Sequence, residues 1–325
     1  MILSVLRIAT DAPDREPEFA TVSPRAPAAL QRAHFFGPMR QMAISSGRIS
    51  RNSGGMNGMK HESEILIDGQ PYTVVTDDLY MSHMEGIFEP DTTRILACMA
   101  RGVILDVGAN IGLTTLLHSR IAEHVHAFEP SPTTFQLLRE NLERADRQNV
   151  TLHNVGLGEQ AGTFELTFAP QNRSGAFVSD QTQASVGHTI ERIQIETLDE
   201  VVRRSHMPKI DMIKIDVEGF ELQVLRGGGK SLSRNKPAVV LEMNHWCLNA
   251  FRRTSIPDFM DALVALFPIV LAVQQDHHRD LRDPSSRYTV MHRHINMFWY
   301  QTLVCAFEPE QVSDLIEAFP LHEGG

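Results

Sequence analysis

The sequence predicts an α/β fold in which helices cover both faces of a mostly parallel β-sheet. The first observation is that short, continuous apolar runs alternate with helical segments from residue 103 onward. Such runs indicate strands buried on both faces, and strand–helix alternation favours a parallel sheet. The second observation is that the first run ends in a glycine-containing turn, Asp106-Val107-Gly108-Ala109-Asn110-Ile111-Gly112. In α/β folds such a turn marks the edge where ligands bind.

Composition excludes several other classes of protein. The chain has 325 residues, of which 42% are apolar and 22% charged, as in an ordinary globular protein. Its net charge of −10 argues against a broad nucleic-acid interface, which needs a basic face. The three cysteines, Cys98, Cys247 and Cys305, lack CxxC spacing, so we expect neither a disulfide framework nor a structural zinc site.

The lengths of the apolar runs bear on where the protein is located. No apolar run reaches the roughly 18 residues of a membrane span. The apolar start of the chain is too short for a secretory signal and no basic residue precedes it. We therefore expect a cytoplasmic protein without a membrane span. The sequence does not predict an oligomeric state.

The chain divides into three predicted parts. Residues 1–62 are rich in proline, serine, glycine and asparagine and predict a poorly ordered arm. Residues 63–101 predict a β-hairpin, Glu64–Asp68 and Tyr72–Thr76, followed by a helix at Pro90–Ala100. Residues 102–325 predict the main domain.

Within the main domain each element has its own signal. Five apolar runs predict the central strands: Val103–Val107, His124–Phe128, Val150–Gly156, Asp211–Asp216 and Ala238–Met243. Amphipathic segments predict helices at Thr114–Ala122, Ser131–Ala145, Leu198–Arg204, Glu221–Leu225 and Ile256–Leu266. Two further β-runs, Thr163–Phe168 and Arg192–Glu196, flank a polar loop at 169–189.

The last two strands complete the predicted sheet. Ile269–Val273 and Asn296–Ala306 are joined by a polar loop, 274–295, without a clear helical pattern. Strands without a crossover helix pair antiparallel. The prediction is a Rossmann-like three-layer sandwich, with a mostly parallel seven-stranded sheet and an antiparallel C-terminal edge strand. The two long loops, 169–189 and 274–295, are the expected walls of a substrate site.

The glycine-containing turn narrows the choice of ligand. Gly108 lets backbone approach a ligand, Gly112 allows close helix–strand packing, and Asn110 tolerates a left-handed conformation. A nicotinamide dinucleotide motif, GxGxxG, would need glycine at 110 and 113, where this chain has Asn110 and Leu113. The spacing resembles instead the first motif of class I S-adenosylmethionine methyltransferases, DxGxGxG, beginning at Asp106.

A second acidic residue strengthens the prediction of a nucleoside site. Glu129 ends the second strand, 23 residues after Asp106. An acid about 20 residues beyond the glycine turn is placed to bind ribose hydroxyls. The alternative is a surface acid or a helix cap.

Several motifs in order resemble the FkbM family of methyltransferases. They are the turn at 106–112, the Phe128–Pro132 segment with Asn141 after it, Asn154–Glu159, Thr197–Glu200, Asp211–Glu221 and Glu242. The resemblance covers about residues 102–245 and tapers towards 306. It implies S-adenosyl-L-methionine as cofactor and methyl transfer to hydroxyl oxygens of natural products or sugars. The predicted cofactor-binding residues lie in these segments: Asp106, Gly108, Asn110, Gly112, Glu129, Ser131 and Gly156.

The candidates for chemistry follow the fourth and fifth strands. Asp216 and Glu218 are two residues apart, so both point to one face at the carboxyl edge. Asp216 could act as base, since an alcohol must lose its proton on methylation, or it could orient the acceptor hydroxyl. Glu218 could position the acceptor or support the cofactor loop. The alternatives are a helix cap or an ion pair with Lys214. His245 is a second candidate base, or a structural residue.

A metal and other functions stay as alternatives. Asp216, Glu218, Glu242 and His245 could gather a divalent cation, but their spacing matches no metal loop, so we expect no resident metal. The leading hypothesis is an O-methyltransferase acting on a small molecule or glycan. Its rivals are a nicotinamide-dependent oxidoreductase and a non-catalytic S-adenosylmethionine-binding protein. Methylation of nitrogen or of a protein also stays open.

Overall fold

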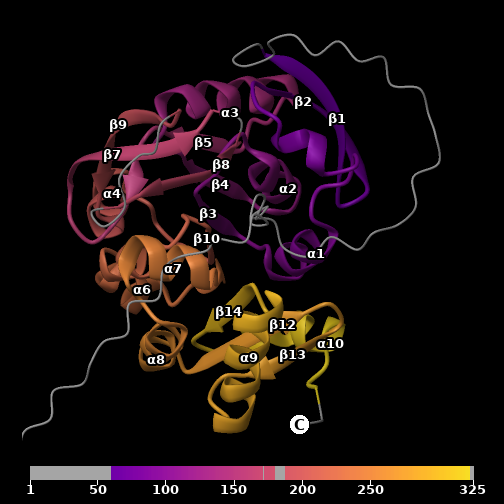
Figure 1. Ribbon diagram of the computed structural model, residues 1–325, viewed down its shortest axis with the longest axis vertical. Helices are drawn as coiled ribbons and strands as arrows, with labels where there is room; N and C mark the ends of the chain where they lie inside the picture. The colour runs from indigo at the N-terminus through magenta and orange to yellow at the C-terminus, as the bar shows by residue number, and fades with distance from the viewer. Residues whose placement is uncertain (1–59, 171, 180–186, 323–325) are drawn as a thin grey trace, which may run out of the picture. The chain divides into compact units, whose positions relative to one another are not determined.

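The computed structural model describes residues 60–170, 172–179 and 187–322 (Figure 1). The arm predicted at 1–62 therefore falls almost wholly outside the described residues. None of the described helices has the length and apolarity needed to cross a membrane.

A hairpin and a helix precede the main domain. Strands β1 (His61–Ile67) and β2 (Gln70–Thr76) pair antiparallel around Asp68-Gly69, both of which have positive φ. A short 3-10 helix, η1 (Tyr80–His83), leads to α1 (Pro90–Met99). We call residues 60–101 the lead-in. Its first strand starts at His61, slightly before the predicted boundary, and both strands bury apolar side chains against the body.

The central sheet has eight strands in the order β13-β12-β14-β11-β10-β3-β4-β5. Five adjacent strands are parallel: β11 (Ala238–Glu242), β10 (Met212–Ile215), β3 (Val103–Val107), β4 (His124–Phe128) and β5 (Val150–His153). The other three are β12 (Ile269–Gln274), β13 (His277–Asp280) and β14 (Thr302–Ala306). The mostly parallel α/β sheet is the predicted one.

The C-terminal part of the sheet corrects the prediction in two details. β14 is antiparallel but lies inside the sheet, between β11 and β12, and the edge is β13, an unpredicted eighth strand. The predicted polar loop at 274–295 contains instead a helix, α9 (Pro284–Met297), capped by Asp283. Only Ser286, Val290 and His294 of α9 are buried, so the helix has no wide apolar stripe for a sequence pattern to reveal.

Helices cover both faces of the sheet and make the predicted three layers. One apolar core contains α1, α2 (Leu113–Ile121), α3 (Pro132–Arg144), the 3-10 helix η2 (Pro309–Val312), α10 (Ser313–Ala318) and the hairpin. The opposite core contains α4 (Leu198–Arg204), α5 (Glu221–Arg226), α6 (Gly229–Asn235), α7 (His245–Arg252), α8 (Ile256–Leu266) and α9. Strand residues alternate between the cores: Ile104 faces the first and Leu105 the second.

A small second sheet takes up part of the predicted loop at 169–189, of which residues 171 and 180–186 lie outside the described residues. Its order is β6-β9-β7-β8, with β6 (Gly156–Leu157), β7 (Gly162–Ala169), β8 (Asn172–Val178) and β9 (Thr189–Glu196). β8 was not predicted because its segment, Asn172 to Gly175, is polar and leaves several side chains partly exposed. Arg173 on β8 pairs with Asp77 of the lead-in at 2.6 Å, which joins the small sheet to the N-terminal part.

The order of the strands sets the position of the ligand site. From β3 the chain moves outward through β4 and β5, whereas β10 and β11 add on the other side of β3. A doubly wound sheet opens a crevice at the carboxyl ends of the two strands where this direction changes. Here those strands are β3 and β10.

Candidate active site

A cavity of about 630 Å³ lies at this switch point. It is lined by the turns after β3, β4 and β10, by the end of β11, by the small sheet and by the lead-in. Six of the predicted site residues line it: Gly108, Asn110, Glu129, Gly156, Asp216 and Glu218. Four others, Asp106, Gly112, Ser131 and His245, do not.

The turn after β3 has the backbone that its sequence predicts. Gly108, Asn110 and Gly112 all have positive φ, of 81°, 50° and 101°. A Cβ at Gly108 would lie 1.9 Å from the backbone oxygen of Asp216, so no side chain fits there. A Cβ at Gly112 would meet Leu138 and Leu142 of α3 at 2.8 Å. Gly108 therefore brings two loops together, and Gly112 brings α2 against α3.

Asp106 lies behind the turn and is completely buried. Its Oδ2 accepts hydrogen bonds from Thr114 Oγ1 at 2.9 Å and Thr115 Oγ1 at 2.6 Å. Its Oδ1 is 3.4 Å from Lys214 Nζ, because Asp106 and Lys214 are register partners on β3 and β10. Burial opposes ionisation, but Lys214 and the hydroxyls hold the pKa of Asp106 below its usual range.

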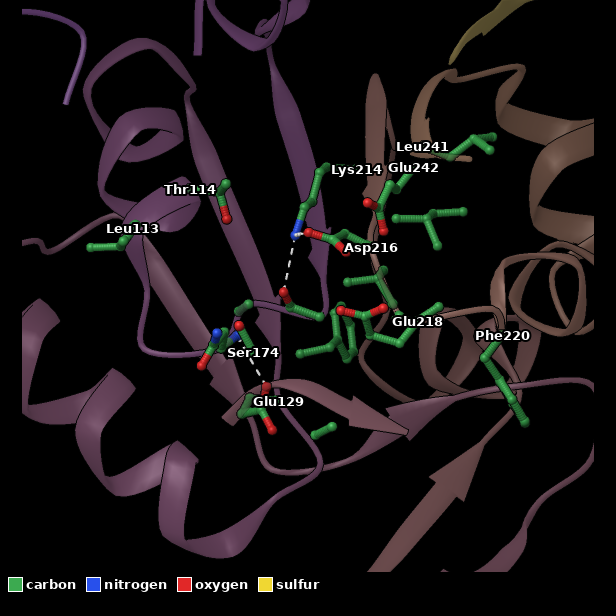
Figure 2. Close-up of a pocket in the computed structure, with 18 of the residues that line it drawn as sticks. Leu113, Thr114, Glu129, Ser174, Lys214, Asp216, Glu218, Phe220, Leu241 and Glu242 are labelled. Carbon is green, nitrogen blue, oxygen red and sulfur yellow. Dashed lines mark hydrogen bonds and ion pairs between the residues drawn. The ribbon is translucent and has the colours of Figure 1, made fainter. Parts of the chain in front are cut away.

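Lys214 connects the turn to the acid after β10. Its Nζ donates to the carbonyl oxygen of Gly108 at 2.9 Å and lies 3.5 Å from Asp216 Oδ2. The Lys214 side chain is 7% exposed, whereas that of Asp216 is 47% exposed and faces the cavity. One ammonium thus orients the glycine turn and Asp216 together (Figure 2). An ion pair with Lys214 was one of the alternatives that the sequence left open, because residues i and i+2 share one face of a strand, and the structure contains this pair.

Glu129 is buried at the end of β4 and reaches the cavity. Its Oε2 accepts from the backbone N–H of Asn110 at 3.0 Å and its Oε1 from that of Ser131 at 2.8 Å. Ser131 itself caps α3, as its hydroxyl accepts from the N–H of Thr134. Burial raises the pKa of Glu129 to about 7, although both backbone bonds favour the charged form.

The turn after β10 carries Asp216 and Glu218. Glu218 and Gly219 have φ of 50° and 91°, and a Cβ at Gly219 would meet the backbone of Cys247 at 2.9 Å. Glu218 Oε2 accepts from Cys247 Sγ at 2.9 Å. Burial and the neighbouring Asp216 raise the pKa of Glu218 to about 8. Burial and Glu218 also raise the pKa of the Cys247 thiol. The thiol therefore stays protonated and donates the hydrogen bond to Glu218.

Three further side chains with oxygen atoms complete this end of the cavity. Glu242 ends β11, and Tyr80 and Glu89 come from the lead-in. Burial and the charge of Asp216 raise the pKa of both Glu89 and Glu242. The sequence analysis noted Glu242 but missed Tyr80 and Glu89, because no spacing reports how the lead-in packs on the sheet.

His245 is not brought to the cavity. It is the first residue of α7, and its ring packs against His294 and Phe298 with centroids 5.0 and 4.9 Å away. Its backbone N–H donates to His294 Nε2 at 3.2 Å. Burial lowers the pKa of His245, which favours the neutral ring. Within the described residues, no group of three or more metal-ligating side chains is arranged to hold an ion.

A family model described as the methyltransferase FkbM domain matches residues 106–279, more than half of the chain. The chain belongs to the FkbM methyltransferase domain family. The match begins at Asp106, so the lead-in with Tyr80 and Glu89 precedes it.

The matches to two named relatives cover only part of this chain and only part of each relative. The hexuronic acid methyltransferase AglP of Haloferax volcanii is 38% identical over 43% of this chain and 56% of its own length. The 31-O-demethyl-FK506 methyltransferase FkbM of Streptomyces tacrolimicus is 30% identical over 38% of this chain and 58% of its own. The chain thus spans little more than half the length of these FkbM relatives.

Among solved structures, the methyltransferase FkbM of Methylobacillus flagellatus KT is similar, with 20% identity and a TM-score of 0.38. The similarity covers 62% of this chain and 42% of that one.

Proposed function

We propose that the chain is an S-adenosylmethionine-dependent methyltransferase that methylates a hydroxyl oxygen of a small molecule or glycan. The observation that carries this proposal is a single cavity with a glycine turn and Glu129 at one end and Asp216 at the other. Membership of the FkbM family supports it. So do the two relatives, one a hexuronic acid methyltransferase and one a 31-O-demethyl-FK506 methyltransferase.

The residues of the cavity fit the cofactor. Glu129 would bind the ribose hydroxyls, and the turn from Gly108 to Asn110 would hold the amino-acid end. Asn110 Oδ1 is buried and has no hydrogen-bond partner in the described part of the chain, so it can accept from a ligand. Gly156, Leu157 and Ile195 line an apolar part of the cavity that suits a flat base. Bound there, the cofactor supplies an electrophilic methyl group on a sulfonium.

Three predicted residues support the cofactor site from behind. Asp106 holds Lys214 and the start of α2, Gly112 lets α2 pack on α3, and Ser131 donates its N–H to Glu129. We assign them positioning roles, since none of them lines the cavity.

Asp216 and Glu218 divide the work on the acceptor. Asp216 faces the cavity and would accept the proton of the acceptor hydroxyl as its oxygen forms the new bond to carbon. Glu218, with its pKa near 8, keeps its proton at neutral pH and would donate a hydrogen bond that orients the acceptor. His245 packs outside the cavity, which favours Asp216 as the base.

Isothermal titration with S-adenosylhomocysteine tests the proposal, with NADH as the rival ligand. We expect micromolar binding of S-adenosylhomocysteine and none of NADH. Glu129→Ala should weaken binding by roughly 10- to 150-fold, since bonds to a charged group contribute about 1.5–3 kcal/mol. Glu143→Ala, an exposed acid on α3, is the matched control and should bind as the parent does.

Two outcomes would replace the proposal. Binding of NADH alone by folded protein would indicate an oxidoreductase. Binding of S-adenosylhomocysteine without methyl transfer to any acceptor would indicate a cofactor-binding protein without catalysis.

A further inference from the structure

The lead-in and strand β8 both line the cavity, and one arginine joins them. Tyr80 and Glu89 line the cavity from the lead-in, and Arg173 and Ser174 line it from β8. Arg173 is therefore both part of the wall and part of the contact between the two segments. The inference concerns how this contact affects cofactor binding, and it rests on the proposed function.

The arginine holds the lead-in through three hydrogen bonds. Arg173 Nε and Nη2 donate to the two carboxylate oxygens of Asp77 at 2.6 and 2.7 Å, and its backbone N–H donates to Asp78 Oδ2 at 2.8 Å. The side chains of Arg173 and Asp77 are only 13% and 15% exposed. Exposed ion pairs contribute little, whereas a mostly buried pair with two parallel bonds fixes both distance and orientation. The contact between the lead-in and β8 therefore has one defined geometry.

Asp78 connects this contact to the wall of the cavity. The carboxylate of Asp78 is buried, and its Oδ1 accepts from Thr76 Oγ1 at 2.8 Å and from the backbone N–H of Tyr80 at 3.0 Å. Tyr80 lines the cavity and begins η1. The position of η1 thus depends on the same carboxylate that binds the backbone of Arg173.

A second set of hydrogen bonds connects the arginine to Glu129. Arg173 Nη1 donates to Thr133 Oγ1 at 2.7 Å, and the Thr133 hydroxyl donates to Glu191. Glu191 also accepts from Ser131 Oγ at 2.6 Å, and the backbone N–H of Ser131 donates to Glu129. The series of bonds that begins at Arg173 therefore ends on the acid proposed to bind the ribose.

We infer that Arg173 and Asp77 are positioning residues for the cofactor: their ion pair holds the lead-in against β8 and, through Thr133 and Glu191, keeps Glu129 aligned for the ribose. Asp77 precedes the segment that the family model matches, whereas Arg173 lies inside it. The pair thus couples the matched segment to the lead-in. Coupling is reciprocal, so a bound cofactor must stabilise the docked lead-in by the factor by which the docked lead-in strengthens cofactor binding.

Titration with S-adenosylhomocysteine measures this coupling. Asp77→Asn and Arg173→Gln should each weaken binding by at least about tenfold, since each removes a hydrogen bond between charged groups. The double variant should lose the same factor and not its square, because either single change already breaks the pair. Arg173→Lys keeps the charge but not the two parallel bonds, so its affinity should lie between those of the parent and Arg173→Gln.

A second ion pair of the lead-in supplies the matched control. Glu62 on β1 pairs with Arg144 of α3 at 2.7 Å, and neither residue lines the cavity. Glu62→Gln should therefore bind S-adenosylhomocysteine as the parent does. Urea titrations of all variants establish that the protein used in each measurement is folded.

Hydrogen exchange separates positioning from a general loss of stability. In the parent and in Glu62→Gln, saturating S-adenosylhomocysteine should slow amide exchange in residues 76–89 by about tenfold, the factor that reciprocity requires. In Arg173→Gln saturated with the same ligand, this protection should be much smaller. A pair that only stabilised the fold would leave the ligand-dependent protection unchanged.

Each other outcome has a defined meaning. Parent-like affinity in both Asp77→Asn and Arg173→Gln overturns the inference. So do additive losses in the double variant, or equal protection of residues 76–89 in the parent and Arg173→Gln. If the folded parent does not bind S-adenosylhomocysteine at all, the proposed function itself fails, and the inference fails with it.

Discussion

The two ends of the cavity are built in different ways. The end proposed for the cofactor consists of Gly108, Asn110, Glu129 and Gly156, which follow the neighbouring strands β3, β4 and β5 and depend on backbone geometry. The opposite end is assembled from the lead-in, the turn after β10 and the end of β11, and depends on carboxyl side chains. The first end is readable from local sequence, whereas the second depends also on how the lead-in packs against the sheet.

The largest expected effect separates chemistry from cofactor binding. Asp216→Asn removes the proposed proton acceptor but keeps the shape of the side chain, so kcat should fall by roughly 10²–10⁴-fold. The affinity for S-adenosylhomocysteine, measured by titration, should stay close to that of the parent. Unchanged turnover in Asp216→Asn would show that Asp216 is not the base.

The next effect tests the backbone-built end. In Gly108→Ala the new Cβ would lie 1.9 Å from the carbonyl oxygen of Asp216 at a φ of 81°, so the two loops must separate. We expect a loss of about 2–4 kcal/mol in the free energy of unfolding, measured with urea, together with loss of cofactor binding. Gly69→Ala is the control: its φ is 70° but nothing lies within 4 Å, so only about 1–2 kcal/mol of backbone strain should result.

A buried acid at the start of α5, Glu221, predicts a pH effect on stability. Glu221 is buried, its Oε1 accepts from the N–H of Gly219, and burial raises its pKa to about 7. The folded state therefore favours the neutral carboxyl. The stability that this contributes is complete below the ordinary pKa, near 4.5, and is lost as the pH rises through about 7.

Glu221→Gln should therefore become more stable relative to the parent as the pH rises. Gln keeps the acceptor oxygen and cannot ionise, so its unfolding free energy relative to the parent should increase by about 1–3 kcal/mol between pH 5 and pH 8. Urea titrations at both pH values measure this. An equal difference at the two values would contradict the raised pKa.

The smallest expected effect separates the role of the Asn110 backbone from that of its side chain. Its φ of 50° is left-handed, so Asn110→Gly should keep the stability of the parent, whereas Asn110→Ala should lose about 1 kcal/mol. Both remove the buried Oδ1, so both should weaken S-adenosylhomocysteine binding by a similar factor. Full affinity in Asn110→Gly would leave only the backbone in contact with the ligand.

The sequence predicted the central sheet well because its signals are local. β3, β4 and α8 have the predicted bounds, since continuous apolar runs and capped amphipathic segments depend on neighbours in the chain. The same holds for the turn after β3, whose glycines mark positive φ directly.

What the sequence missed depends on contacts far apart in the chain. The bidentate pair between Arg173 and Asp77 joins residues 96 positions apart, and Glu89 reaches the cavity only because α1 packs on α2 and α10. α9 was missed because few of its residues are buried and two of them, Ser286 and His294, are polar. Its buried side therefore gives no pattern of apolar residues at helical spacing. His245 follows β11 in the chain, yet it starts a helix that carries its ring towards α9 instead of the cavity.

The family match begins at Asp106, inside β3, so Tyr80 and Glu89 of the lead-in precede it, whereas the turn after β3, Glu129 and Asp216 lie within it. On the proposed roles, the matched segment carries the residues for the cofactor and the base, and the lead-in adds part of the wall on the acceptor side. Exchange of residues 60–101 would change that wall without a substitution in the matched segment. Chimeras that combine the lead-in of one family member with the remainder of another would test this.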